Sequence, residues 1–416
     1  MDGTIVGIDV GTTKVCTLIG EPDPDGAARI VGLGIVPSAG LHKGIVVNVE
    51  EATAAIAASV EEAENISGKS ITRAYVGVTG EHISSMNSRG TIPIGYGNQP
   101  ITTGDVKRAI EAAQAIAIPH NRRMVHVIPR AYIVDGQDGI RDPVGMQAFR
   151  LEVEVHIVTA AVASLHNLVR CVERAGIEVV DLVLEPMASA EAVLRSPERQ
   201  MGVALADIGG GTTDIAVFYD GAVVHTAALP VAGHQLTNDL AVVLRTPMET
   251  AELIKVRHGH VIPSRLDDAE PIDVSGFGDE GAHMVPRPYI AQVLEARVGE
   301  MLGLIDRETK RSGYNGLLPA GLVLCGGSTE LPGLKDLARQ TLDVPVRIGT
   351  PRGGIGLSDA VDGPAYATSV GLLLWGLRHG EDAVIHTNGH RPAANNTLGR
   401  FLGWVRSAFF PQRVEG

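Results

Sequence analysis

The stretch ADIGGGTTDIAVF, residues 206–218, joins two apolar segments through an aspartate, three glycines and two threonines. The apolar and β-branched residues on either side predict two strands joined by a tight turn. We expect the glycines to adopt positive φ and to let a ligand approach the main chain. Exposed N–H groups and threonine hydroxyls would favour an anion. A plain glycine-rich hairpin is the alternative. The residues concerned are Asp207, Gly209, Gly210, Gly211, Thr212 and Thr213.

Asp207 needs a separate explanation, because a carboxylate repels a phosphate. It fits if a cation such as Mg²⁺, with its water shell, lies between the two groups.

The same pattern occurs again in TIVGIDVGTTKVCTLIG, residues 4–20. Two such hairpins half a chain apart predict a duplicated pair of domains, each offering a phosphate loop to one shared cleft. A lysine here can act as a point charge on a phosphate, although it could equally be a solvated side chain. The loop residues are Asp9, Gly11, Thr12, Thr13 and Lys14.

A third element, AGLVLCGGSTELPGL at residues 320–334, reads as a strand, a glycine turn at Gly326 and Gly327, and a helix. Ser328 or Thr329 is the expected N-cap of that helix. A turn of this kind lets a flat group lie against the backbone.

In this order, the three elements resemble those of the actin, Hsp70 and sugar-kinase superfamily. The segments 184–194 and 366–377 resemble its two hinge helices. The resemblance implies ATP and Mg²⁺ in the cleft, with Asp9 and Asp207 holding the metal through water and Asp207 as a candidate catalytic carboxylate. Any ATP hydrolysis would be slow and act as a switch.

Three further residues are assigned to the nucleotide by position. Gly233 begins a predicted helix and would meet a phosphate through its backbone. Glu252 and Lys255, three residues apart on one helix face, correspond to a pair near the adenosine in the superfamily. An exposed salt bridge is the alternative for this pair. The resemblance assigns the turn at Gly326 and Gly327 to the adenosine, and Ser328 is grouped with that turn.

Composition limits the classes of function. The net charge of −13 argues against a general nucleic-acid binder. The three cysteines are widely spaced in apolar segments, which indicates free thiols in a reducing compartment. The chain starts on a strand and has no apolar run of about 20 residues, so we expect a cytoplasmic protein without a signal peptide.

The segment 81–157 interrupts the superfamily pattern with a predicted small α+β insert. Its sequence, which includes VIPRAYIVDG and DPVGM, resembles the FtsA family of bacterial cell-division proteins, as does the later segment LEPMASAEAVL. The resemblance covers essentially the whole chain. The predicted fold is α/β and actin-like, with two duplicated domains around a nucleotide cleft. The predicted parts are a first domain (1–80, 158–198 and hinge helix 366–378), the insert (81–157), a second domain (199–244 and 317–365), a mostly helical insert (245–316), a linker (379–395) and an amphipathic helix (396–411).

The FtsA resemblance implies several partners: the C-terminal tail of FtsZ, other copies of the chain in a head-to-tail filament through 81–157, and other division proteins. The helical insert would receive the acidic FtsZ tail, with Arg297 and Arg307 as candidate contacts. A helix with mixed charges is, alternatively, just a solvated face.

The segment NNTLGRFLGWVRSAFFPQRVEG, residues 395–416, has an aromatic and aliphatic stripe at helical spacing, flanked by arginines. A basic helix of this kind suits the interface of an anionic membrane, so we expect the chain to lie on the inner face of the cytoplasmic membrane at the division septum. A helix docked on the chain's own surface is the alternative. The membrane residues are Leu398, Phe401, Leu402, Trp404, Val405, Phe409, Arg400 and Arg406.

Two other functions remain open from the sequence. A type IV pilus assembly protein related to FtsA would share the insert but lack the tail. A small-molecule kinase would need a proton acceptor near the γ-phosphate and a polar substrate pocket, and the cleft segments show no such polar set beyond Asp207.

Overall fold

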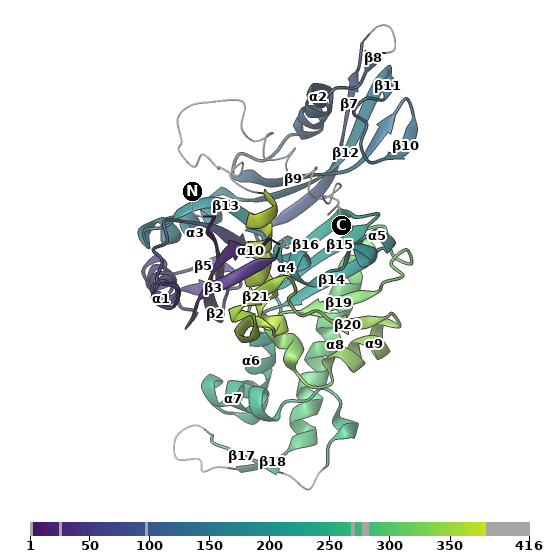
Figure 1. Cartoon of the computed structure of the whole chain (residues 1–416). Coiled ribbons are helices and arrows are strands. Elements are labelled where there is room, and N and C mark those ends of the chain that lie inside the picture. The colour runs from purple at the N-terminus through teal and green to yellow at the C-terminus, as the bar shows by residue number, and fades with distance from the viewer. Residues whose placement is uncertain (1–2, 25–26, 96–98, 268–270, 277–282, 380–416) are drawn as a thin grey trace.

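The computed structural model describes residues 3–24, 27–95, 99–267, 271–276 and 283–379. Two sheets built on the same plan form its centre, shown in Figure 1. In each sheet, three strands consecutive in the chain form an antiparallel meander, and two later strands extend the sheet in parallel from the free edge of the first. The strand orders are β13-β6-β1-β2-β3 and β20-β19-β14-β15-β16. The predicted duplication is therefore visible in the strand order.

The first sheet carries α1 (Val49–Ser67), predicted as a helix over 50–65. The Asn48 side chain accepts from two N–H groups of its first turn, and Gly68 ends it at φ 67°. α3 (Val162–Arg174) packs beside α1. The strands are β1 (Ile5–Val10), β2 (Lys14–Pro22), β3 (Ala28–Pro37), β6 (Arg73–Val78), β13 (Glu178–Leu184) and β21 (Gly354–Gly356), with the small hairpin β4 (Leu41–His42) and β5 (Ile45–Val46).

β21 corrects one predicted boundary. Residues 317–365 were expected in the second domain, but β21 pairs in parallel with β3 of the first sheet, Gly354 opposite Ala28. The chain therefore returns to the first half before the hinge helix begins, because the open edge of β3 takes up these residues as a further strand.

The second sheet contains β14 (Val203–Ile208), β15 (Thr213–Tyr219), β16 (Ala222–Leu229), β19 (Leu322–Cys325) and β20 (Val346–Ile348). Its helices are α5 (Ser196–Met201), α6 (Gly233–Leu244) and α9 (Leu334–Leu342). The expected N-cap of α9 is wrong, since α9 begins at Leu334 after Gly333. Ser328 and Thr329 lie instead in the 3₁₀ turn η2 (Gly327–Glu330).

Two buried helices, α4 (Glu185–Val193) and α10 (Ala367–His379), pack against each other between the halves. They contain the two segments that resemble hinge helices. The turns η3 (Leu357–Val361) and η4 (Pro364–Tyr366) lead into α10. Apolar residues of both sheets join these helices in one core, and the three cysteines are free and buried.

Residues 81–157 form an α+β unit around a four-stranded antiparallel sheet, β10-β9-β12-β7, with α2 (Thr103–Gln114) packed on it and a core of its own. Its strands are β7 (Ser84–Pro93), β8 (Gln99–Pro100), β9 (Arg122–Val134), β10 (Gln137–Ile140), β11 (Gln147–Ala148) and β12 (Arg150–Ala161). We call this unit the sheet insert.

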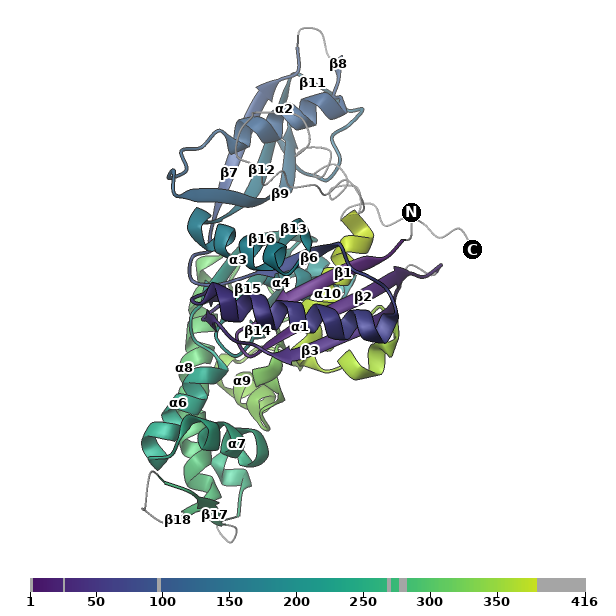
Figure 2. The same ribbon diagram turned by 90° about the vertical axis from the view of Figure 1, so that its left-hand side faces the viewer.

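The second insert is mostly helical, with α7 (Met248–His258), the turn η1 (Pro263–Arg265) and the 25-residue α8 (Arg287–Arg311). A short hairpin that the sequence did not suggest, β17 (Pro271–Val274) with β18 (His283–Pro286), joins them. Figures 1 and 2 agree that this helical insert and the sheet insert lie at opposite ends of an elongated molecule.

None of the helices in the described ranges is both long enough and apolar enough to cross a membrane. The predicted helix 396–411, and the predicted linker beyond His379, lie outside the described residues.

Candidate nucleotide site

A cavity of about 460 Å³ lies where the two halves meet, a size that suits a small-molecule ligand. Sequence elements far apart in the chain line it together. The residues predicted to bind the nucleotide that line this cavity are Asp9, Gly11, Thr12, Thr13, Lys14, Asp207, Gly209, Gly210, Gly211, Thr212, Gly233, Glu252, Lys255, Gly326, Gly327 and Ser328. Thr213 does not line it, because its hydroxyl points the other way and donates to the Val231 carbonyl at 2.6 Å.

Each hairpin presents free backbone donors to this cavity. A bond from Gly11 N–H to the Lys14 carbonyl closes the first turn at 3.1 Å, and one from Gly209 N–H to the Thr212 carbonyl closes the second at 2.9 Å. Among the described residues, no acceptor takes the N–H groups at positions 12, 13, 210 and 211. These donors form the kind of concavity that binds anions.

The reason for the glycines differs from the expected one. None of Gly11, Gly209, Gly210 and Gly211 has positive φ. A Cβ on Gly210 would instead lie 2.0 Å from Thr13 Oγ1, and one on Gly211 would lie 2.5 Å from Thr12 Oγ1. The glycines of the second hairpin therefore make room for the threonines of the first.

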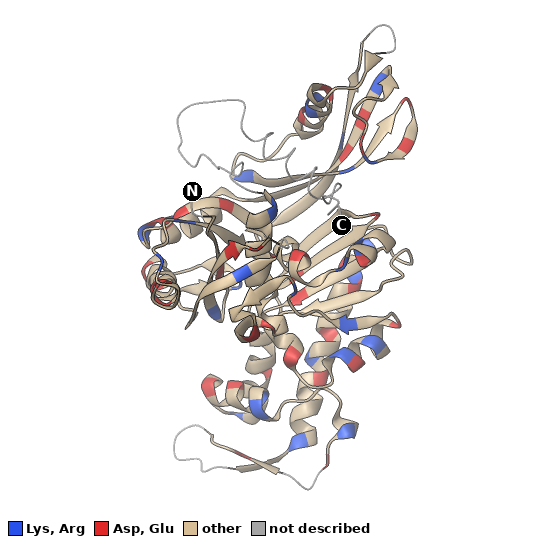
Figure 3. Cartoon of the chain, in the orientation of Figure 1, with Lys and Arg blue, Asp and Glu red and all other residues tan. Residues whose placement is uncertain are grey.

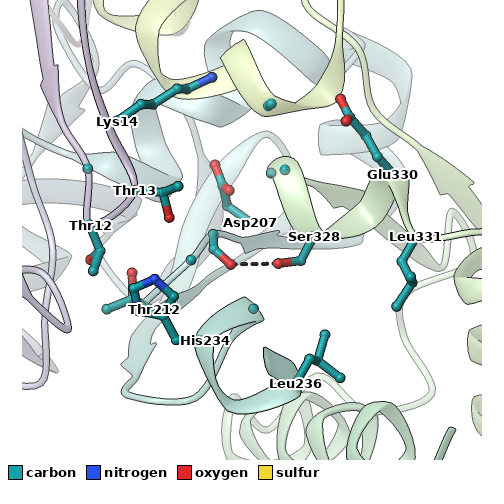
Figure 4. A pocket seen from close by; sticks show the side chains of 18 of the residues that line it. Thr12, Thr13, Lys14, Asp207, Thr212, His234, Leu236, Ser328, Glu330 and Leu331 are labelled. Carbon is teal, nitrogen blue, oxygen red and sulfur yellow. Dashed lines mark hydrogen bonds between the residues drawn. The ribbon is translucent and has the colours of Figure 1, made fainter. Parts of the chain in front are cut away.

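Gly233 also differs from its prediction. It begins α6 and lines the cavity, but its N–H donates to the Gly209 carbonyl at 3.0 Å. The same carbonyl accepts from Ser328 Oγ at 2.7 Å, the dashed line in Figure 4. These two bonds hold α6, the second hairpin and the Gly326–Gly327 turn together, and they leave the Gly233 N–H unavailable to a phosphate.

The pair of Glu252 and Lys255 lies in this wall of the cavity. Lys255 Nζ lies 2.6 Å from Glu252 Oε2 and donates to Thr237 Oγ1 at 2.8 Å. The pair does form an i,i+3 salt bridge, in which the Lys255 side chain is 14 % exposed and the Glu252 side chain 43 % exposed. Leu236 and Val256 add apolar surface beside the pair.

Three buried carboxylates, Asp9, Glu185 and Asp207, line the cavity, and a fourth, Asp214, adjoins Asp207 without lining it. Ser369 Oγ donates to Asp9 at 2.8 Å, and Ser189 Oγ and Thr368 Oγ1 donate to Asp207 at 2.6 and 3.1 Å. Burial raises the pKa of Asp9 to about 6 and also raises that of Asp207. Coulombic repulsion between the two carboxylates adds to the rise for Asp9.

Two of these carboxylates were missed in the sequence. Asp214 lies opposite Asp207 in the β14–β15 pair, where burial raises its pKa to about 7 and the Thr79 hydroxyl donates to it. Glu185 starts α4 and lines the cavity, and burial together with Asp9 raises its pKa well above the usual range. An acidic residue inside an apolar hinge segment was a signal that could have identified Glu185.

The candidate contacts for an acidic partner lie on α8 and do not line this cavity. Arg297 already donates to both oxygens of Asp239, at 2.5 and 2.9 Å, and to Glu300 at 2.5 Å. Arg307 is exposed, and no carboxylate within the described part of the chain pairs with it. The structure therefore does not bring these two arginines into one site.

Comparison with known families and structures identifies the chain. The profile described as "Cell division protein FtsA" matches residues 204–371, and that of the "SHS2 domain inserted in FTSA" matches residues 80–159. A "Cell division protein FtsA" from Pseudomonas aeruginosa is 43 % identical, covering 97 % of this chain and 98 % of the relative. The Escherichia coli K12 protein of the same name is 36 % identical, over 97 % and 96 %.

Solved structures show the same fold at low identity. The "PilM-PilN type IV pilus biogenesis complex" matches with a TM-score of 0.65 and 17 % identity, covering 90 % of this chain and 98 % of that one. MreB5 of Spiroplasma citri "bound to ADP" matches with a TM-score of 0.53 and 14 % identity, covering 88 % and 94 %. These matches confirm the actin-like fold. With more than a third of its residues identical to those relatives over nearly its whole length, the chain belongs to the FtsA family of cell-division proteins.

Proposed function

We propose that the cavity binds ATP with Mg²⁺, and that bound nucleotide controls a cell-division scaffold. The observation that carries the proposal is the convergence of two hairpins, with their free N–H groups, on one cavity that also contains Lys14. The hairpins would hold the phosphates, and the Gly326–Gly327 turn and the Glu252–Lys255 wall would hold the adenosine. Membership of the FtsA family favours a scaffold over a small-molecule kinase, which would need its own substrate pocket beside the γ-phosphate.

The donor set suits magnesium. Burial raises the pKa values of Asp9 and Asp207 although Lys14 attracts both carboxylates, and a divalent cation would add positive charge that favours their ionised form. No group of three His, Cys, Asp or Glu residues among those described could hold a metal alone. We therefore assign Mg²⁺ to phosphate oxygens and water, with Asp9 and Asp207 as acceptors of the bound water.

Turnover, if any, would use a carboxylate as proton acceptor. Asp207 remains a candidate, but two hydroxyls already donate to one of its oxygens. Glu185 lines the same cavity, and no hydrogen bond to its carboxylate is found within the described residues. Glu185→Gln should slow hydrolysis while leaving ATP affinity within about threefold, measured by calorimetry and single-turnover kinetics.

Family membership supports a role at the inner face of the cytoplasmic membrane at the septum, where the chain would tether FtsZ and recruit other division proteins. The sequence of residues 396–411 supports the membrane contact, because a basic aromatic stripe suits an anionic lipid surface. A single short helix binds weakly, so firm attachment would need several copies held in a polymer.

Co-sedimentation with anionic liposomes tests this tether. Removal of residues 396–416, or Trp404→Glu, should release the protein and leave ATP binding intact. Ser407→Glu adds the same charge on the opposite face of the predicted helix and is the matched control. If the truncated chain sediments like the full chain, the tail is not the anchor, and the hypothesis of a type IV pilus assembly protein gains support.

The FtsZ tail is the proposed acidic ligand of the helical insert. Arg307 is the stronger candidate because its charge is unpaired among the described residues, whereas a ligand at Arg297 would have to displace Asp239. Arg307→Ala should weaken binding of an FtsZ tail peptide more than Lys310→Ala does, since Lys310 is already paired with Asp306. Equal effects would remove Arg307 from the site.

Self-association through the sheet insert is proposed from the family resemblance. Deleting 81–157 should abolish filaments on a lipid monolayer and spare ATP binding. Because Ser85 and Asn87 of the insert donate to β16 carbonyls, deletion also exposes β16. Phe149→Glu, at a side chain that is 60 % exposed, is therefore the cleaner variant. Filaments that persist in both variants would contradict the proposal.

A further inference from the structure

Of the two lysines that line the cavity, Lys255 pairs with a carboxylate, whereas no carboxylate of the described residues lies within 4 Å of the Lys14 ammonium. Within the described chain, the lysines that pair with a carboxylate within 4 Å are Lys69, Lys255 and Lys310. Burial lowers the pKa of Lys14, and Asp9, Glu330 and Asp207 act on it only through longer-range attraction. A partly buried ammonium without a direct counter-ion benefits from another source of stabilisation.

The ring of Tyr366 supplies a contact for this ammonium. Lys14 Nζ lies 3.4 Å from the centroid of the Tyr366 ring. Figure 4 shows the Lys14 side chain extending away from Thr12 and Thr13 rather than folding back over them. The ring face attracts a cation through its quadrupole, and the attraction is stronger where water is partly excluded.

Hydrogen bonds anchor the segments that precede and follow Tyr366 in the chain. Tyr366 ends η4 and directly precedes α10. The Pro364 carbonyl accepts from Gly326 N–H at 2.9 Å, and Tyr366 N–H donates to the Gly363 carbonyl at 3.1 Å. Just beyond it, Thr368 and Ser369 donate to Asp207 and Asp9. These bonds anchor the backbone on both sides of Tyr366, next to the groups that bind the carboxylates of both hairpins.

We propose that Tyr366 is a positioning residue that holds the Lys14 ammonium at the cavity wall for a polyphosphate ligand. A carboxylate in the same place would neutralise the lysine and would have to be displaced by the phosphate. An aromatic face carries no net charge, so it restrains the side chain and leaves the full positive charge for the anion. This inference rests on the proposed nucleotide site.

The first test measures Mg²⁺–ATP affinity by calorimetry in the full-length chain. Tyr366→Phe keeps the ring and should bind within about twofold of the native protein. Tyr366→Leu removes the ring and should weaken binding about 3- to 30-fold, the range of a partly buried cation–π contact. In a Lys14→Met background, Tyr366→Leu should have no further effect, because the cation it positions is gone.

A second test needs no nucleotide. Amine labelling of the ligand-free protein, read by mass spectrometry, should modify Lys14 several times faster in Tyr366→Leu than in Tyr366→Phe, relative to Lys69 in the same sample. Thermal unfolding of both variants checks that they fold.

The outcomes separate the two ideas. Failure of the native chain to bind ATP contradicts the proposed function, and the labelling arm still decides on the ring contact. Tighter ATP binding in Tyr366→Leu would mean that the ring holds the lysine away from the ligand, which overturns the proposal. An equal loss with and without Lys14 would assign Tyr366 a packing role only and would also overturn it.

Discussion

The two hairpins of the cavity, β1–β2 and β14–β15, have similar sequences but contribute different side chains to the contact between the halves. The first presents threonines toward the second, and the second presents glycines toward the first. A side chain on Gly210 would collide with Thr13, and one on Gly211 with Thr12. The only cation of the two turns, Lys14, belongs to the first hairpin. The duplication has therefore become asymmetric and complementary, and the glycines serve the closure of the cavity.

The largest expected effect comes from Gly210→Val. Its Cβ would lie 2.0 Å from Thr13 Oγ1, so the halves cannot close around a ligand. Overpacking by this amount costs about 1–3 kcal/mol, and we expect Mg²⁺–ATP affinity to fall about 5- to 150-fold by calorimetry. Gly209→Ala is the control, since its Cβ would meet nothing nearer than the Thr212 carbonyl at 3.3 Å. Unchanged affinity in Gly210→Val would count against this site.

A rescue experiment decides what the glycine is for. Gly210→Ala should weaken binding, and adding Thr13→Ala should restore it to the level of Thr13→Ala alone. The second change removes the hydroxyl at 2.0 Å and leaves Thr13 Cβ at 3.3 Å, a tolerable contact. If the double variant stays as weak as Gly210→Ala, the glycine makes room for the phosphate and not for the other hairpin.

The carboxylates of the two hairpins should make the affinity depend on pH. Their pKa values are about 6 for Asp9 and about 7 for Asp214, and a bound Mg²⁺ favours the ionised form. Mg²⁺–ATP affinity should therefore rise as pH increases from about 5.5 to 8, by up to tenfold per pH unit for each proton released. Asp9→Asn and Asp214→Asn, titrated separately, show which hairpin carries the dependence. A flat profile in the native chain would contradict the raised pKa values.

The same two groups predict the stability of the ligand-free protein. Their folded-state pKa values exceed the unfolded value of 3.8, so the folded state binds more protons between about pH 4 and pH 7. Stability from these groups is present at low pH and is lost as pH rises through about 6 to 7. In Asp214→Asn this loss should be smaller, as measured by denaturant unfolding at several pH values. A native chain that gains stability over this range would show that other groups dominate.

The smallest effect is expected for Thr12→Val. Thr12 Oγ1 accepts from Gly44 N–H at 3.2 Å, which ties the first hairpin to the β4–β5 turn. Valine has the same shape but removes the acceptor, at a cost of about 1 kcal/mol in the free energy of unfolding. Thermal unfolding should shift by about 1–3 °C, with ATP affinity nearly unchanged. A large loss of affinity would mean that the Thr12 hydroxyl itself contacts the ligand.

The distribution of charged residues does not distinguish the regions of the molecule as the two hairpins do. Figure 3 shows acidic and basic residues interspersed over the sheet insert, α8 and α9, without a continuous basic face in that view. This arrangement agrees with the net charge of −13, and neither observation suggests nucleic acid as a partner.

The two hairpins, their duplication, the glycine turn at Gly326 and the family could all be predicted from the sequence. These features are local, because strand, turn and strand follow from residues adjacent in the chain. The resemblance likewise rests on short motifs in a set order. The position of α1 was also predictable within a few residues, since helical periodicity is a local signal.

The residues that contact each other across the two halves could be identified only in the folded structure. Thr13 meets Gly210, Tyr366 meets Lys14, and β21 joins the first sheet, and each pair is separated by about 200 residues or more in the chain. Such contacts depend on how two separately patterned sheets pack around α4 and α10. No local periodicity encodes that packing, and for this reason the purpose of the glycines and the place of Asp214 emerged only from the folded chain, whereas Glu185 had a sequence signal that was missed.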